Sequence, residues 1–249
     1  MKTFNPIKKE VVGILTSSPV GRLIELFTNN QIRYRNVLVN TVHSEISKYI
    51  KACLFWGLYE KQEAKFIQKY LSSELPVIEL GASIGVISSL TAKKAFPQQV
   101  YSVEANPRLI PIIENNLKIN QVNNCRVMNV AIGDAAAVFF TPGSDNTVGT
   151  ITRTKYDNSV AVNCLSLSGI ISQLGLNKFN LVCDIEGSEV DFLFRDSDSL
   201  SACELMIIEL HDGLVGERHI KIDMLKDQIV ALGFSLIDSH GPVIVAKRV

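Results

Sequence analysis

The sequence lacks both a net charge and a long apolar run, and each absence argues against a class of partner. The 25 lysines and arginines balance the 25 aspartates and glutamates among 249 residues, so no overall field attracts the chain to nucleic acid or to anionic lipid. The first apolar run, Val11–Leu15, is too short for a signal peptide or a membrane span. We therefore expect no nucleic-acid partner, no membrane span and a cytoplasmic location.

Cysteine is also scarce, and its pattern argues against a disulfide framework. The five cysteines are odd in number, widely spaced and mostly within apolar runs, at Cys53, Cys125, Cys164, Cys183 and Cys203. This pattern is typical of buried, unpaired thiols in a reducing compartment rather than of disulfides or a zinc site. With 47% hydrophobic and 20% charged residues, the composition is that of a globular protein with a substantial core.

Two common nucleotide-binding motifs are absent from the stretch that dominates the sequence, residues 77–107. The apolar run Pro76–Leu80 predicts a buried strand, and Gly81–Gly85 predicts a tight turn that opens a helix. A dinucleotide fingerprint needs glycine at 81, 83 and 86, but Ser83 and Val86 stand at two of these positions. A phosphate loop needs a Gly-Lys-Ser/Thr ending, which is missing. The sequence therefore argues against NAD, FAD and nucleoside triphosphates.

What remains in this stretch fits a nucleoside without a pyrophosphate. The helix must end before Pro97, and a second strand, Val100–Val103, runs into Glu104. An acid about twenty residues past the loop reaches both hydroxyls of a ribose that lies across the end of the first strand. The glycines let such a ligand approach backbone N–H groups at the start of the helix. S-adenosylmethionine is the common ligand of this description.

The same loop also satisfies a hydrolase motif. Gly81-Ala82-Ser83-Ile84-Gly85 matches G-x-S-x-G, the nucleophile elbow of the α/β-hydrolases, with a strand before it and a helix after it. In this alternative Ser83 is the nucleophile, and His211, His219 or His240 is the base. Against it, no histidine-glycine oxyanion motif precedes the loop, and Glu104 has no task.

The rest of the chain alternates strands and helices. Before the central stretch we expect a helix over 20–27, a strand over 32–39 and two helices over 44–71 separated at Gly57. After it we expect a helix capped by Asn106 and kinked at Pro111, strands over 126–132 and 135–141, and a surface loop or substrate lid over 142–160. The last part should contain a helix over 165–174, strands over 179–183 and 205–210, a helix over 217–232, and a hairpin of 234–237 with 243–246. This order predicts an α/β fold with a doubly wound, mostly parallel sheet and an antiparallel last strand. We expect an N-terminal extension of helices and a short strand over 1–72 and the main domain over 73–249.

Polar side chains follow several of the predicted strands. Glu104, Asp134, Asp184, Glu186 and His211 each come just after a strand. In an open α/β sheet, ligands bind beyond the carboxyl ends of the strands. We therefore expect these five side chains on one rim of the sheet.

These residues resemble the FkbM family of S-adenosylmethionine-dependent methyltransferases, over roughly residues 32–211. The resemblance is carried by Gly57-Leu58-Tyr59-Glu60, Glu79-Leu80-Gly81-Ala82-Ser83-Ile84-Gly85, Val103-Glu104-Ala105-Asn106-Pro107, Ala131-Ile132-Gly133-Asp134, Asp184-Ile185-Glu186-Gly187-Ser188-Glu189 and Ile208-Glu209-Leu210-His211. It implies a Rossmann-like class I methyltransferase fold with a seven-stranded sheet and S-adenosylmethionine as cofactor. The implied reaction is O-methylation of a hydroxyl on a sugar, a glycan or a related metabolite.

The resemblance also assigns cofactor contacts. Gly81, Ala82, Ser83 and Gly85 approach the methionine and ribose, and Glu104, with Ala105 and Asn106 beside it, takes the ribose hydroxyls. Ala131, Ile132 and Asp134 bracket the adenine. Glu79 supports the loop, and Tyr59 with Glu60 closes the methionine end.

For catalysis we expect His211 to remove the proton of the acceptor hydroxyl, because a neutral imidazole is available near pH 7. Asp184 and Glu186 then orient this base, contact the amino group of the cofactor, or hold a divalent cation together with Glu209. Carboxylates with a single histidine do not select an ion, so we assign no metal. The family usually has lysine at the position of Val182, so a cofactor-binding module without catalysis is a further alternative. The expected partner is a small-molecule or glycan acceptor, and no oligomeric state is indicated.

Overall fold

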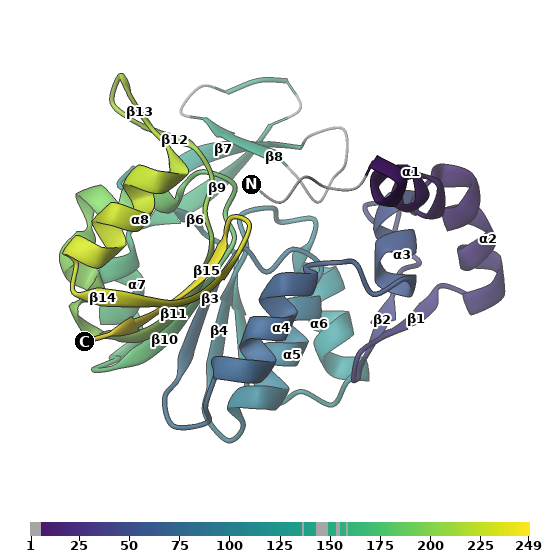
Figure 1. Ribbon diagram of the computed structural model, residues 1–249, viewed down its shortest axis with the longest axis horizontal. Coiled ribbons are helices and arrows are strands. Elements are labelled where there is room, and N and C mark those ends of the chain that lie inside the picture. Colours follow the sequence, from purple (N-terminus) through teal and green to yellow (C-terminus); the bar gives the residue numbers. More distant parts are fainter. Residues whose placement is uncertain (1–5, 136, 143–148, 153–154, 158) are drawn as a thin grey trace.

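The computed structural model describes residues 6–135, 137–142, 149–152, 155–157 and 159–249 (Figure 1). The first part contains α1 (Pro6–Leu15), α2 (Ser18–Thr28), β1 (Gln31–Tyr34), β2 (Val37–Asn40), α3 (Lys48–Phe55) and α4 (Lys61–Tyr70). The middle part contains β3 (Val77–Leu80), α5 (Val86–Ala95), β4 (Val100–Val103), α6 (Ile110–Ile119), β5 (Cys125–Met128), β6 (Ala131–Ile132), β7 (Ala137–Pro142), β8 (Gly149–Thr152) and β9 (Val160–Leu165). The last part contains α7 (Leu167–Leu174), β10 (Phe179–Cys183), η1 (Asp191–Arg195), η2 (Ser197–Ala202), β11 (Cys203–Glu209), β12 (Gly213–Val215), β13 (Arg218–Ile220), α8 (Ile222–Ala231), β14 (Phe234–His240) and β15 (Val243–Arg248).

The central sheet has seven strands in the order β14-β15-β11-β10-β3-β4-β5. The pairs from β11 through β10, β3 and β4 to β5 are parallel, whereas β15 is antiparallel to both β11 and β14. The chain leaves β3 toward β4 and β5 on one side, and only later adds β10 on the other side. The doubly wound sheet and its antiparallel last strand are therefore confirmed, and β3 lies where the strand order reverses, the place at which such sheets bind ligands.

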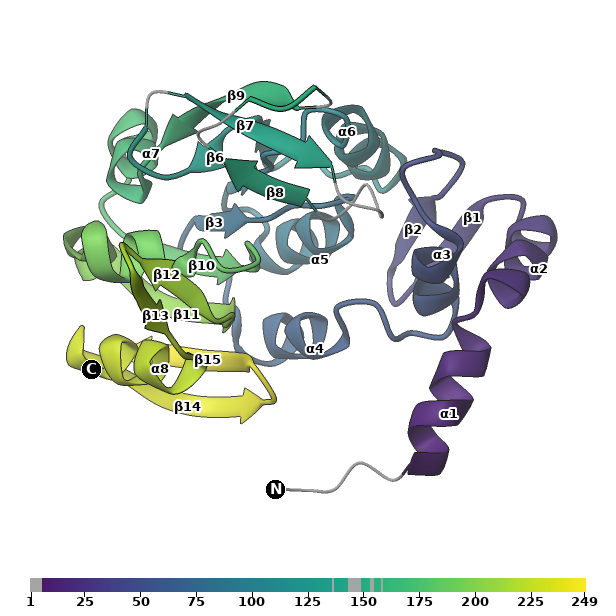
Figure 2. The same ribbon diagram turned by 90° about the horizontal axis from the view of Figure 1, so that it is seen from above.

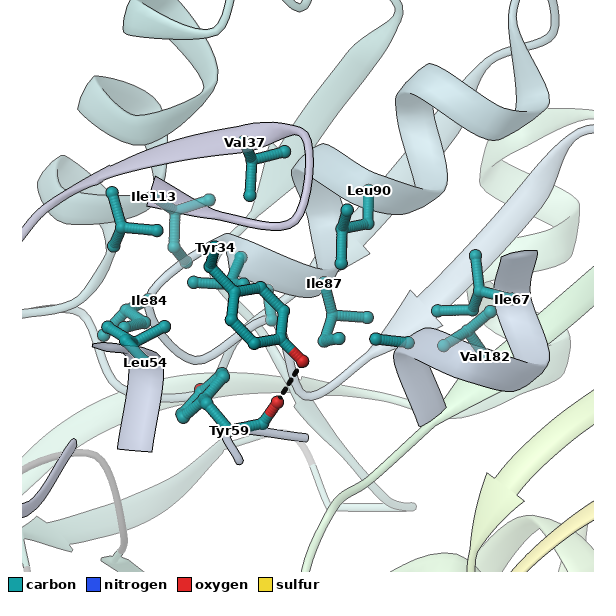
Figure 3. Close-up of a cluster of buried hydrophobic side chains, with 14 of the residues drawn as sticks. Tyr34, Val37, Leu54, Tyr59, Ile67, Ile84, Ile87, Leu90, Ile113 and Val182 are labelled. Carbon is teal, nitrogen blue, oxygen red and sulfur yellow. Dashed lines mark hydrogen bonds between the residues drawn. The ribbon is translucent and has the colours of Figure 1, made fainter. Parts of the chain in front are cut away.

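Helices cover both faces of this sheet (Figure 1). Successive side chains of a strand point to opposite faces, and β10 shows the consequence. Val182 packs in the same cluster as side chains of α4, α5 and α6, including Ile67 (Figure 3). Leu181 and Cys183 pack instead with side chains of α7, η1 and α8. β10 is thus buried on both sides, as its continuous apolar sequence predicts.

The N-terminal elements lie beside the sheet, next to α5 and α6 (Figure 2). The β1–β2 hairpin is held on α6, because the backbone N–H of Asn40 donates to Asn116 Oδ1 at 2.8 Å and that of Leu38 donates to Asn120 Oδ1 at 2.8 Å. Tyr34, which is almost fully buried, donates from its hydroxyl to the backbone oxygen of Tyr59 at 2.5 Å (Figure 3). This bond fixes the connection between α3 and α4 at the carboxyl ends of the strands.

Two expectations from composition can be compared with the structure. All five cysteines are unpaired, and four of them are buried, which confirms the prediction of free thiols. In the part of the chain that the structure describes, none of the helices combines the length and the apolar character that crossing a bilayer requires.

Three predicted elements before residue 133 differ from the observed ones. The predicted strand over 32–39 is a hairpin, because Arg35 adopts a left-handed conformation with φ 52° between β1 and β2. The predicted strand over 126–132 breaks after Met128, where Asn129 Nδ2 donates to the backbone oxygens of Glu104 and Ala105 instead of continuing the strand. The helix expected after Asn106 begins only at Ile110. Pro111 therefore occupies its first turn, where no N–H partner is lost, and produces no kink.

Two further predictions were wrong in the second half. The helix expected over 217–232 is shorter, because β12 and β13 form a hairpin around Gly216 and α8 starts at Ile222. The surface loop expected over 142–160 contains β8, which pairs with β7. Positions 143–148, 153–154 and 158 of that predicted loop lie outside the described residues.

Candidate active site

A cavity of about 410 Å³ lies at the carboxyl ends of β3, β4 and β10. Its volume falls within the range of ligand pockets. Among the residues that line it are eleven that the sequence predicted as site residues, namely Tyr59, Glu60, Gly81, Ala82, Ser83, Glu104, Ala105, Ala131, Ile132, Asp184 and Glu186. None of the described lining residues is a lysine, an arginine or a histidine. The cavity is therefore a strongly acidic one.

The glycine loop lines the cavity on one side and packs directly against neighbouring backbone on the other. The N–H groups of Gly81 and Ala82 both donate to the backbone oxygen of Val103, at 2.9 and 3.0 Å. Gly81 has φ +90°, and a Cβ at this position would overlap the backbone oxygen of Asp184. Gly85, with φ +78°, begins α5 and packs on Ile113 rather than lining the cavity. The two glycines thus fix the loop geometry, and only Gly81 faces the ligand space.

Glu104 connects the second strand to the loop. Its Oε2 accepts a hydrogen bond from the N–H of Ser83 at 2.8 Å, and its Oε1 accepts one from the N–H of Asn106 at 2.7 Å. Burial raises the pKa of this carboxyl group to about 7, although these backbone donors act in the opposite direction. Each carboxylate oxygen has a further lone pair. Glu104 can therefore accept ribose hydroxyls, while Asn106 supports it from outside the cavity.

Glu79 lies beneath the loop and not in the cavity. Its side chain is 1% exposed, one carboxylate oxygen accepts from Ser102 Oγ, and Oε1 has no partner among the described residues. Burial raises its pKa from the usual 4.5 to about 7. Glu79 therefore acts on the site through β3 and β4.

The Glu79 carboxyl group should make stability depend on pH. Between about pH 4.5 and 7 the folded chain binds more protons here than the unfolded chain, so the free energy of unfolding falls as pH rises through this window. We expect Glu79→Gln to be more stable than the unsubstituted chain by up to about 3 kcal/mol at pH 8, with a much smaller difference at pH 4.5. Urea unfolding at both pH values measures this difference, with the exposed Glu114→Gln as control. An equal pH dependence in Glu79→Gln and the unsubstituted chain would contradict the assignment.

Four carboxylates surround His211 at the edge of the cavity. Glu189 Oε1 lies 3.0 Å from Nδ1, while Glu186 Oε2, Glu209 Oε1 and Asp184 Oδ1 lie 3.4, 3.9 and 4.0 Å from Nε2. Asp184 and Glu186 line the cavity, but His211 lies behind them and does not. Asp184, Glu186 and His211 thus lie together at the edge of the sheet as predicted, with the two carboxylates lining the cavity and the imidazole on their far side.

This arrangement changes the expected charge of the imidazole. The hydrogen bond with Glu189 is the main cause that raises the pKa of His211 to about 9, against the effect of its burial. Burial, then the carboxylates of Glu60 and Glu209, raise the pKa of Asp184 to about 8. His211 therefore keeps its proton at pH 7, and the expectation of a neutral imidazole was wrong for the chain without ligands.

One acidic side chain of the cavity was missed by the sequence analysis. Glu63 is 4% exposed and lines the cavity from α4, and no other described residue forms a hydrogen bond with its carboxyl group. Burial raises its pKa well above the usual range. The available signal was its position among Ala64, Phe66 and Ile67 on the buried face of α4, where a carboxylate is unusual.

Asp134 occupies a different place from that predicted. It lines a second, smaller cavity of about 230 Å³ together with Ser168 and Arg195, whereas Ile132 lines both cavities. The chain leaves the central sheet before Asp134, because β6 pairs with β9 in a separate four-stranded sheet. Ala131 and Ile132 therefore line the main cavity, whereas Asp134 lines the neighbouring one.

The hydrolase alternative lacks its catalytic contact. Ser83 does adopt a strained left-handed conformation, with φ 49°. Its Oγ, however, accepts a hydrogen bond from the hydroxyl of Tyr59 at 3.2 Å, and no hydrogen bond among the described residues joins it to a histidine. Ser83 therefore lines the cavity without the histidine contact that a hydrolase nucleophile needs.

The protein is a Rossmann-like, S-adenosylmethionine-dependent methyltransferase. Its glycine loop lies where the strand order reverses, an acid ends the next strand, and the cavity has the size of a nucleoside site. Residues 41–183, more than half of the chain, match the TRM5/TYW2 methyltransferase domain, and the chain belongs to that family. The expected enzyme class and cofactor are confirmed, whereas the match does not show the FkbM family.

Three solved structures of similar fold are compared by sequence identity, coverage of each chain and TM-score. TYW2 of M. jannaschii in complex with AdoMet is 16% identical, with 88% of this chain and 86% of that chain covered and a TM-score of 0.44. Trm5b from Pyrococcus abyssi is 15% identical, with 88% and 56% covered and a TM-score of 0.47. A protein of the NADB-Rossmann superfamily from Streptococcus agalactiae is 10% identical, with 75% and 68% covered and a TM-score of 0.47. No curated protein matches the chain.

Proposed function

We propose that the protein methylates a hydroxyl group of a sugar, a glycan or a related metabolite. The observation that carries this proposal is the set of side chains in the cavity, because Glu60, Glu63, Asp184 and Glu186 line it without any lysine or arginine among its described residues. A phosphate-rich acceptor would find no basic partner there, whereas carboxyl groups, protonated or ionised, form hydrogen bonds with neutral hydroxyl groups.

The cofactor roles follow from the two ends of the cavity. Glu104 accepts the ribose hydroxyls, and Ala131 with Ile132 contacts the adenine. At the other end, Glu60 and Glu63 face the methionine portion, whose ammonium and sulfonium groups are cationic. We propose residues 1–72 as an extension of the methyltransferase domain at 73–249, and this extension supplies both of these acids.

The transfer needs little help beyond alignment and proton removal. When bound, S-adenosylmethionine would supply a methyl group from its sulfonium sulfur, which would keep the electron pair of the broken carbon–sulfur bond as the acceptor oxygen bonds to the methyl carbon. Asp184 and Glu186 hold the acceptor hydroxyl at the cavity edge. Its proton passes to a carboxylate oxygen of Glu186, which lies 3.4 Å from Nε2 of the protonated His211. Val182 takes no part, because it is buried in the core.

The second candidate acceptor is RNA, and the TRM5/TYW2 family match favours it. RNA binding relies on lysine and arginine contacts with phosphates and on stacking with exposed bases. The balanced charge of the chain and the acidic cavity favour the sugar instead.

An acceptor panel separates these possibilities. Methyl transfer from radiolabelled S-adenosylmethionine is measured with neutral glycosides, polyhydroxylated metabolites and unfractionated tRNA. We expect label in the glycosides or metabolites only. Label in tRNA alone would overturn the proposal, and cofactor binding without transfer to any acceptor would indicate the cofactor-binding module.

His211→Ala tests the catalytic group. Because His211 lies outside the cavity lining, we expect the Kd of S-adenosylhomocysteine to change less than threefold. We expect kcat to fall about 10²-fold, the lower end of the effect of general acid–base groups, because the imidazole positions the carboxylates of Asp184 and Glu186. Calorimetry and steady-state rates measure the two quantities, with the exposed His219→Ala as control. Weaker cofactor binding with unchanged kcat would show that His211 serves the cofactor instead.

A further inference from the structure

We propose that Asp184, Glu186 and His211 form a binding site for a divalent metal ion of the Mg²⁺ or Mn²⁺ type at the edge of the cofactor cavity. The role of this ion rests on the proposed function, because it would bind the acceptor hydroxyl. The site itself rests on the geometry of these side chains.

The ligand atoms are already close enough to share one ion. One ligand atom from each of Asp184, Glu186 and His211 lies within 4.8 Å of the other two. The Nε2 atom of His211 is 3.4 Å from Glu186 Oε2 and 4.0 Å from Asp184 Oδ1. Two ligands that each lie about 2.2 Å from an ion have such separations at angles of roughly 100° to 130°. Mg²⁺ prefers angles near 90°, so a bound ion would draw these side chains closer together.

His211 is held as a metal-binding histidine is held. Its Nδ1 atom is 3.0 Å from Oε1 of Glu189, a side chain with 0% exposure. The same Glu189 oxygen accepts the backbone N–H of Ile185 at 3.3 Å, which fixes the carboxylate. Ligating histidines usually donate the other ring N–H to a carboxylate, because this fixes the tautomer and directs the free nitrogen at the metal. The other nitrogen here is Nε2, which lies nearest Asp184 and Glu186, and a bound ion would displace its proton.

An unpartnered oxygen supports a cation at this position. Asp184 Oδ1, the atom nearest Nε2 on that residue, is buried and has no hydrogen-bond partner among the described residues. The described ion pairs bring His211 to Asp184, at 4.0 Å, but no lysine or arginine. A buried carboxylate oxygen without a donor is costly, and a bound metal ion would supply the partner.

The ligand types narrow the choice of ion. Carboxylate oxygens dominate, with Glu209 Oε1 a further 3.9 Å from Nε2, and only one nitrogen contributes. Oxygen-rich sites suit Mg²⁺ and Mn²⁺ rather than ions that prefer thiolates. An ion at this position would act as a Lewis acid on the acceptor oxygen, which makes its proton easier to lose before the methyl group is transferred.

Mn²⁺ binding to the full chain, followed by electron paramagnetic resonance, tests the site. We expect one saturable Mn²⁺ site that Mg²⁺ competes for. Glu186→Gln and His211→Ala should each weaken Mn²⁺ binding at least tenfold, whereas Glu204→Gln, at the opposite end of β11, should not. Glu186 is the safer substitution for folding, because its side chain is 57% exposed. The absence of a saturable site, or its persistence in both variants, would overturn the proposal.

Two other measurements keep this result separate from the proposed function. S-adenosylhomocysteine binding and methyl transfer to a hydroxylated acceptor are measured in EDTA and in Mn²⁺. Transfer that is equal in both conditions, together with no Mn²⁺ site, would remove the metal and leave the O-methyltransferase. A Mn²⁺ site with the expected variant effects, but transfer to tRNA only, would retain the metal and remove the sugar acceptor.

Discussion

Glu104→Ala is expected to weaken binding of S-adenosylhomocysteine about 10³-fold. The substitution removes the carboxylate that would accept two ribose hydroxyls, and hydrogen bonds to a charged group contribute about 1.5–3 kcal/mol each. It also leaves the N–H groups of Ser83 and Asn106 without the acceptor that they use at 2.8 and 2.7 Å. A loss near 4 kcal/mol corresponds to about three orders of magnitude in Kd.

Calorimetric titration measures this loss directly. Glu114→Ala is the matched control, because Glu114 is an exposed acid on the neighbouring α6. Its Kd should equal that of the unsubstituted chain. A change of less than tenfold in Glu104→Ala would show that the ribose does not lie on this carboxylate.

Gly81→Ala is expected to lower the free energy of unfolding by about 4 kcal/mol or more and to abolish cofactor binding. Two effects add at this position. The backbone has φ +90°, where a side chain is strained, and the new Cβ would overlap the backbone oxygen of Asp184. To relieve the overlap, β3 and the Asp184 segment would have to separate, which would distort the cavity.

Gly57→Ala separates the two effects. Gly57 also has a left-handed φ, +67°, but a Cβ there would meet no atom within 4 Å. We expect this variant to lose only about 1 kcal/mol. Urea unfolding of both variants gives the comparison, and similar losses in the two would show that the contact with Asp184 is unimportant.

The central part of the fold could be predicted because its signals are local. The apolar run before Gly81, the glycine loop and the strand that ends at Glu104 each depend on neighbouring residues, and the structure has β3, α5 and β4 there. The strand of residues 179–183 was also predicted with its observed bounds, because both of its faces are buried and its sequence is continuously apolar.

Other parts depend on contacts between distant residues and could not be predicted in this way. The strand break after Met128 is made by the side chain of Asn129, which bonds to the backbone of Glu104 and Ala105. The hairpin that replaces the start of the predicted last helix turns at Gly216, within a segment that also has a helical apolar pattern. Periodicity alone does not distinguish these outcomes.

The arrangement of side chains in the candidate site also depends on contacts between distant residues. The sequence placed the acids at the strand ends, but it could not show that Asp184 and Glu186 line the cavity while His211 lies behind them. The charge of His211 depends on Glu189, whose contact with the imidazole joins two segments that lie 22 residues apart in the sequence. Side-chain order within a rim is set by packing, which no spacing rule supplies.

A crystal structure with S-adenosylhomocysteine tests most directly whether the cofactor occupies the cavity at the ends of β3, β4 and β10. We expect its ribose hydroxyls within hydrogen-bond distance of Glu104, its adenine beside Ala131 and Ile132, and its amino acid end toward Glu60 and Glu63. Density for the ligand elsewhere, or a cavity without ligand at a saturating concentration, would contradict it.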